Sequence, residues 1–111
     1  CWDNCATLIC ELSDERLEAL IPRLLVWLQD LNWPGACAIR NRLMALPISM
    51  LKRPLEITAL YADLMNDDMW IEFLSAFSDH KALMAAFDPE ARRILESARD
   101  ANGQDLNGVP R

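Results

Sequence analysis

Apolar side chains recur along most of the chain at spacings of three and four residues, the period of one helix face. Val occurs only at Val26 and Val109, whereas Leu and Ala are abundant, a balance that favours helix over strand. The pattern predicts helices over residues 3–11, 14–20, 22–31, 34–46, 54–65, 68–79, 81–87 and 89–101, with a short helical turn from Ile48 to Leu51. Because 14–20 could merge with 22–31 through a bend at Pro22, we expect an all-α domain of about six to seven helices.

Local signals place the ends of these helices. Ser13, followed by two acidic residues, is a good N-cap, and Pro22 and Pro54 suit the first position of a helix, where a missing N–H costs nothing. Asp88 before Pro89 marks another start, and 102–103 (Asn-Gly) predicts the stop of the last helix. We assign residues 1–103 to one domain and expect 104–111 to be a disordered tail.

A loose repeat is superimposed on this pattern. Asp30 and Trp33 recur as Asp67 and Trp70, roughly 37 positions later, and each group lies between two helix-period segments. Such a recurrence is typical of stacked α-hairpins, in which no pair of helices can cover its own apolar face. We therefore expect two antiparallel helix pairs that pack against each other, with further helices at both ends.

Composition and charge narrow the function. The chain of 111 residues fits one domain and carries 17 acidic against 11 basic side chains, a net charge of −6. The basic residues are scattered, so the concentrated basic surface that binds nucleic acid is absent from the sequence. No charge-free run approaches the ~20 residues that cross a bilayer, and the first residues lack the basic start of a signal peptide. We expect a cytoplasmic protein without a membrane or nucleic-acid partner.

Four cysteines raise the question of a metal site. Cys1 and Cys5 are one helical turn apart, but Cys10 is out of phase with them and Cys37 stands alone. A zinc site is one interpretation, although structural zinc prefers two paired sets of ligands. The other is free thiols in a reducing compartment. We predict free thiols, with no metal and no cofactor.

Four polar residues precede the predicted helices of the two pairs. Asp30, Asn32, Asp67 and Asp68 could each cap a helix and fix a turn. They could also form a row on one rim that binds basic or amide groups of a partner. The two interpretations are compatible, since capping leaves one carboxylate oxygen free.

Aromatic and basic residues offer a second candidate surface. Trp27 is predicted to be core, whereas Trp33 and Trp70 border turns and could be either core or anchors of an interface. Arg40 and Arg42 lie on the second helix of the first pair, the kind of helix that lines the inner surface of such arrays. They could bind a protein segment or be ordinary solvated charges.

The sequence offers little for catalysis. Asp79-His80 is the one pairing that suggests acid–base chemistry, and no Ser, Cys or second His stands at a suitable spacing. The three glycines, Gly35, Gly103 and Gly108, form no phosphate-binding loop. We therefore predict that the protein is not an enzyme.

One stretch is specific enough to indicate a family. Residues 24–34, Leu-Leu-Val-Trp-Leu-Gln-Asp-Leu-Asn-Trp-Pro, follow Ile21-Pro22 and resemble the signature of the bacterial domain-of-unknown-function family 5071. Residues 66–70 with 73–75, and Trp2-Asp3, resemble two further stretches of that family. The resemblance covers roughly residues 2–78, and the segment from Asp79 to Ala101 departs from the pattern. It implies a short HEAT-like α–α superhelix and no established activity.

Together these observations favour a non-enzymatic α-helical module that binds another protein, of the adaptor or immunity type. The alternative is a HEAT-like domain that processes nucleic acid, or another enzyme, which would need a basic cleft around Arg40, Arg42 and Arg53. A purely structural or dimerising element is a third hypothesis. The candidate binding residues are Asp30, Asn32, Trp33, Arg40, Arg42, Asp67, Asp68 and Trp70.

Overall fold

The computed structural model describes the backbone of residues 2–29 and 35–107 and the side chains of residues 6–29 and 35–101. Within these residues the protein is all-α, with eight α-helices and one 3-10 helix, more than the six to seven expected. They are α1 (Trp2–Cys10), α2 (Asp14–Glu18), α3 (Ile21–Trp27), α4 (Ala36–Met44), α5 (Ile48–Leu64), α6 (Asp68–Leu74), η1 (Ser75–Asp79), α7 (Lys81–Ala86) and α8 (Pro89–Asn107). No helix in the described ranges is long and apolar enough to cross a membrane.

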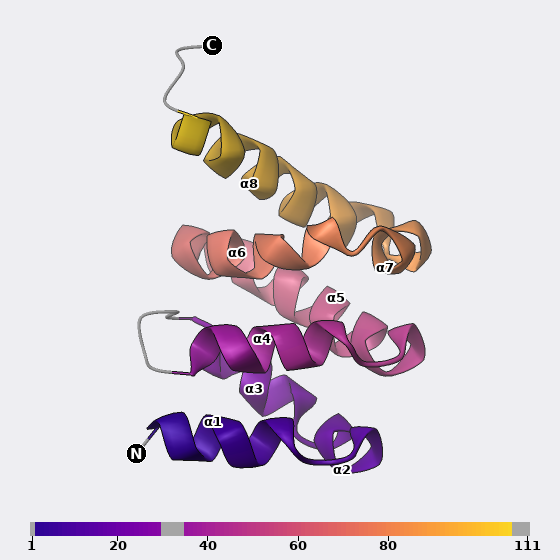
Figure 1. Ribbon diagram of the computed structural model, residues 1–111. Helices are drawn as coiled ribbons and strands as arrows, with labels where there is room; N and C mark the ends of the chain where they lie inside the picture. The colour runs from indigo at the N-terminus through magenta and orange to yellow at the C-terminus, as the bar shows by residue number, and fades with distance from the viewer. Residues whose placement is uncertain (1, 30–34, 108–111) are drawn as a thin grey trace.

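The helices are stacked along the long axis of the molecule (Figure 1). In this view α1, α4 and α6 lie one above another, α3 and α5 lie behind them, and α8 covers the far end. Helix α3 packs against α5, so the two predicted helix pairs do bury each other's apolar faces. Helix α5 also packs against α6 and α8, which makes it the central helix of the fold.

Three predicted caps are formed. The side-chain oxygens of Ser13, Asp67 and Asp88 accept hydrogen bonds from the backbone N–H three residues later, at 3.4, 3.1 and 3.0 Å respectively. Each bond satisfies one of the four N–H groups that lack a partner inside a helix at its start. The caps therefore lie where the sequence predicted them.

Several predicted helix boundaries were wrong. Helix α3 ends at Trp27 and not at residue 31, because the N–H groups of Leu28 and Gln29 turn back to carbonyls three residues earlier. It is separate from α2, as predicted, and the alternative of one merged helix with a bend at Pro22 is not formed. Helix α4 begins at Ala36, since Gly35 at its N-cap has a positive φ of 89°.

Pro54 does not begin a helix, contrary to the prediction. It lies inside α5, which runs unbroken from the predicted short turn into the predicted 54–65 helix. Leu51 and Leu55 on either side of it are completely buried, and this packing holds the two parts in one helix. The Thr58 hydroxyl donates to the Pro54 carbonyl at 2.8 Å.

The predicted 68–79 helix becomes the α-helix α6 followed by the 3-10 turn η1. At the other end, α8 runs through Gly103 to Asn107, so the Asn-Gly pair does not stop it. A single glycine costs a helix only about 1 kcal/mol relative to alanine, too little to end one without a left-handed cap. Residues 108–111 of the predicted tail lie outside the described residues.

The core is one continuous cluster of buried side chains contributed by α1 to α8. Its largest completely buried members are Phe77, Leu17, Ile21, Leu25, Leu28, Ile39, Leu43, Leu51, Leu55, Leu74, Leu83 and Leu95. Trp70 belongs to the core as well, with an exposed fraction of 3%. Trp27, predicted as core, is 39% exposed, so that prediction was wrong.

Candidate functional site: an exposed apolar face on helices α3 and α5

The predicted polar rim is only partly described. Asp30, Asn32 and Trp33 lie outside the described residues. Asp67 caps α6, which is the first of the two roles considered for this residue. Asp68 is exposed in the first turn of the same helix. Of the two described rim residues, Asp67 therefore stabilises the start of α6, and the carboxylate of Asp68 is exposed to solvent.

Trp70 is not available as an interface anchor. Its indole Nε1–H donates to the Leu25 carbonyl at 3.1 Å, and its ring meets that of Tyr61 edge-on, with centroids 6.2 Å apart. A buried Trp whose N–H is satisfied in this way belongs to the core. The side chain joins α6 to the ends of α3 and α5.

Arg42 does not protrude as predicted. Its Nε donates to the Cys10 carbonyl at 3.1 Å, and its Nη2 donates to the Leu12 carbonyl at 3.0 Å and to the Asp14 carboxylate at 2.7 Å. These bonds satisfy carbonyls at the end of α1, as a cation near a helix C-terminus commonly does. Arg40 is partly buried, and its Nε has no hydrogen-bond partner among the described residues. Arg42 is therefore held by contacts within the protein, and Arg40 stays a candidate.

The structure reveals a different surface, which the sequence interpretation missed. Most of the large apolar side chains that are exposed lie on α3 and α5: Val26, Trp27, Ile57, Leu60, Tyr61 and Leu64, with Met65 just beyond. On α5 they are spaced three and four residues apart, so they form a stripe on one side of the helix. That stripe lies opposite the buried residues Leu55, Ala59 and Ala62.

Trp70 brings the two helices of this surface together. It contacts Leu25 of α3 by a hydrogen bond and Tyr61 of α5 by an aromatic contact. Val26 and Trp27 follow Leu25 directly, and Leu64 lies one turn after Tyr61. Trp70 therefore links the ends of the two helices that carry these exposed apolar residues.

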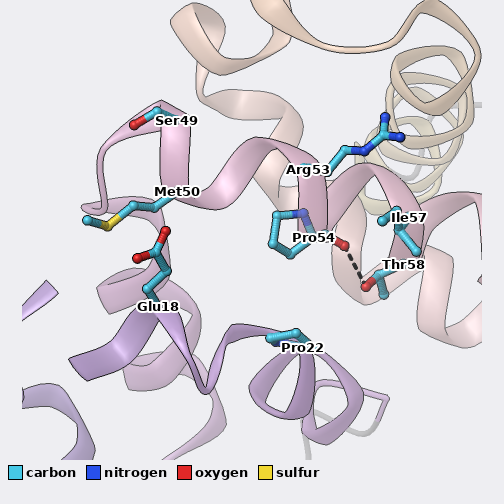
Figure 2. A pocket seen from close by; sticks show the side chains of 8 residues that line it. All are labelled: Glu18, Pro22, Ser49, Met50, Arg53, Pro54, Ile57 and Thr58. Atoms are coloured by element: carbon cyan, nitrogen blue, oxygen red, sulfur yellow. Dashed lines mark hydrogen bonds between the residues drawn. The ribbon is translucent and has the colours of Figure 1, made fainter. Parts of the chain in front are cut away.

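A groove of about 350 Å³ extends this surface toward the start of α3 (Figure 2). Pro22 forms one wall, and Met50, Pro54 and Ile57 of α5 form the other. Pro22 is one turn before Val26, and Ile57 is one turn before Tyr61. The groove thus continues into the exposed stripe, and we call the whole surface, formed by Pro22, Val26, Trp27, Pro54, Ile57, Leu60, Tyr61 and Leu64, the α3–α5 face.

A second hollow, of about 400 Å³, lies between α1 and α4. It is lined by Ala6, Cys10, Glu11 and Ala38, and it reaches Gly35.

The Asp79-His80 pair has structural contacts, and of the four cysteines Cys1 and the side chain of Cys5 lie outside the described residues. His80 accepts a hydrogen bond from the Leu83 N–H at its Nδ1 and so begins α7, while Asp79 pairs with Arg99 at 2.7 Å. Cys10 and Cys37 are free thiols. No group of three potential metal ligands occurs among residues whose side chains are described.

Six ion pairs occur among the described side chains. Glu56 of α5 is 1% exposed, and its Oε2 accepts the Asp88 N–H at 2.6 Å and pairs with Lys52 at 3.1 Å. On the outside of α8, the hydrogen bond from Arg93 lowers the pKa of Glu90, with the charge of Arg93 adding to it. Sequence reasoning also missed Glu56, because a Lys four residues earlier is typical of an exposed pair.

Comparison with known proteins completes this description. The chain belongs to the family described as Domain of unknown function (DUF5071), which matches residues 3–104. The match continues through the segment from Asp79 to Ala101, where the sequence resemblance had been expected to end. No curated protein and no solved structure matches the chain.

Proposed function

We propose that this protein is a non-enzymatic interaction module that binds another protein through its α3–α5 face. One observation carries the proposal. Large apolar side chains stand exposed in a row on α5, and the row runs into a groove whose other wall is Pro22 of α3. Contiguous exposed apolar surface is costly in a monomer and commonly marks a binding site. An adaptor or an immunity-type protein of the cytoplasm is the kind of role that we propose.

The shape of the surface favours a helix as the bound element. Two adjacent helices leave a furrow between them, and a partner helix can place its apolar residues in that furrow. Trp27 and Tyr61 supply the aromatic contact area that often dominates the affinity of such interfaces. From Pro54 to Leu64 the face is about 15 Å long at 1.5 Å per residue, the length of about three helical turns.

The alternative of a nucleic-acid-processing domain has less support. Of its three proposed cleft residues, Arg42 is bonded to Asp14 and Arg53 lies 3.7 Å from the buried Glu56. Arg92, Arg93 and Arg99 are also paired with carboxylates. Basic side chains that are neutralised within the protein release few counterions from phosphates. We therefore favour a protein partner.

A peptide-display selection tests the proposal. Random peptides of about 16 residues are selected on the wild-type protein and then measured against Leu64→Asp, a change at a side chain that is 75% exposed. We expect binding to fall at least tenfold, about 1.4 kcal/mol, because a carboxylate in the apolar face must lose its water.

Leu8→Asp is the matched control, since Leu8 is also exposed but lies on α1. Circular dichroism confirms that each variant is folded. Selected peptides that bind wild type and Leu64→Asp equally well, or a selection that yields none, would contradict the proposal.

A further inference from the structure

The end of the groove next to α2 combines an apolar wall with one carboxylate. Pro22, Met50, Pro54 and Ile57 supply the wall, and Glu18 stands at the edge. Figure 2 shows the carboxylate of Glu18 turned toward Met50, over the groove. Glu18 forms no ion pair among the described residues, so its charge has no internal cation to neutralise it.

The basic side chain that lines the groove does not fill that role. Arg53 also lines the groove, but Figure 2 shows its guanidinium pointing away from Pro22 and Glu18. It lies on the side of Glu56, 3.7 Å from that buried carboxylate. The charge that faces the open groove is therefore negative, in agreement with the net charge of −6.

The backbone of α5 has one carbonyl that lacks its usual helix donor, that of Met50, a residue that also lines the groove. In an α-helix the carbonyl of Met50 would accept the N–H of residue 54, and Pro54 has none. The Met50 carbonyl thus lacks its usual helix donor beside the groove that Met50 and Pro54 line. A carboxylate and a carbonyl that needs a donor suit a group that carries both positive charge and N–H bonds.

We propose that this end of the groove binds a lysine or arginine side chain of the partner, and that the partner segment is an amphipathic helix. The inference rests on the proposed function of the α3–α5 face. The aliphatic stem of the cation packs against Pro22, Pro54 and Ile57, while its head reaches Glu18 and the Met50 carbonyl. Long basic side chains commonly bury their stems and keep their heads in a polar environment in this way.

This anchor sets the sequence pattern of the partner. A basic residue in the groove is followed along the helix by apolar residues spaced three and four apart, which contact Ile57, Tyr61 and Leu64 in turn. The apolar residues supply most of the affinity, and the cation selects the position along the face.

Three synthetic helical peptides of about 16 residues test the inference. All share a central row of leucines spaced three and four apart. The first has lysine at both ends of this row, so that either orientation places one lysine in the groove; the second has norleucine and the third glutamate at those positions. Affinities are measured by fluorescence anisotropy at low salt, and the isoleucine and methionine methyl groups of the protein are followed by NMR.

We expect the lysine peptide to bind about fivefold more tightly than the norleucine peptide, and the glutamate peptide to bind most weakly, since partly exposed ion pairs contribute modestly. Glu18→Gln should remove the advantage of lysine. Glu15→Gln, the same change on the same helix but outside the groove, should preserve it.

Equal binding of the lysine and norleucine peptides, still lost in Leu64→Asp, would overturn the cationic anchor and leave the proposed function standing. Tighter binding of the glutamate peptide would assign the groove to Arg53 and overturn the inference as well. Methyl shifts outside the face, or no binding by any of the three peptides, would also refute it. The display selection decides separately whether the face binds protein at all.

Discussion

Helices α5 and α8 pack against each other, yet their outer faces are built from opposite kinds of residue. Helix α8 buries Ala91, Ile94 and Leu95 and presents charged side chains such as Arg92 and Arg93 to water. Helix α5 buries Leu55, Ala59 and Ala62 and presents large apolar side chains instead. Only α8 has the polar outer face that is typical of a surface helix.

The difference separates two roles for apolar residues. On the inner face of α5, the small side chains of Ala59 and Ala62 let neighbouring helices approach closely, while Leu51 and Leu55 fill the core. The outer residues Ile57, Leu60 and Leu64 are larger than these alanines but are left exposed. Folding does not require them there, because α8 shows that a polar outer face suffices. This surplus of apolar surface is what points to a partner.

The largest change in stability is expected between substitutions on the two faces of α5. Leu55→Ala should lower the free energy of unfolding by about 3 kcal/mol, since it removes buried methyl groups and leaves a cavity. Leu64→Ala, the same chemical change on the outer face, should cost less than about 0.5 kcal/mol. Urea denaturation followed by circular dichroism measures both. A loss above about 1 kcal/mol for Leu64→Ala would mean that the outer face contributes to folding, and the comparison would fail.

A smaller effect is expected where α5 holds α8. The buried carboxylate of Glu56 accepts the N–H of Asp88, the residue that caps α8, so it fixes where α8 begins. Glu56→Ala should cost about 2 kcal/mol, because it leaves this N–H without an acceptor and opens a cavity. Urea denaturation again gives the value, and amide hydrogen exchange should show the first turn of α8 opening more often.

Glu56→Gln is the matched control for this effect. Its amide oxygen can still accept the Asp88 N–H, but it loses the ion pair with Lys52, so we expect about half the loss of the alanine variant. A glutamine variant as unstable as the alanine variant would show that the charge, and not the hydrogen bond, connects α5 to α8.

Much of the fold could be predicted from sequence, because caps and apolar periodicity are local. Ser13, Asp67 and Asp88 each cap a helix as their positions suggested. The wrong predictions lie where contacts between residues far apart in the sequence determine the helix boundaries. Pro54 resembles a helix start, but the burial of Leu51 and Leu55 carries the helix through it. Gly103 resembles a stop, although α8 continues to Asn107.

The candidate site was less predictable, since hydropathy does not say which side of an apolar helix is covered. On α5, Leu55 and Leu60 look alike in sequence, and only the positions of α3, α6 and α8 leave Leu60 outside. Arg42 and Trp70 were chosen for their chemistry, but both are engaged by carbonyls more than 25 positions away along the chain. A sequence signal did exist: the apolar residues of 54–65 spread over most of the helix circumference, more than one buried face requires.

The smallest prediction concerns the outer face of α8, where Glu90 and Arg93 form an exposed ion pair. The hydrogen bond from Arg93 lowers the pKa of Glu90, so the stabilisation from this pair is present above the pKa of the unfolded state and is lost as the pH falls through the lowered value. Arg93→Ala should raise the pKa of Glu90 toward its ordinary value of 4.5, as followed by carboxyl NMR, whereas Arg92→Ala should not. Either change should shift the urea midpoint at neutral pH only slightly, because water screens exposed pairs. A clear loss of stability in Arg93→Ala would mean that the polar face of α8 also helps to hold the fold. The outer faces of α5 and α8 would then differ only in residue type. The exposed apolar row of α5 could no longer be regarded as unnecessary for folding.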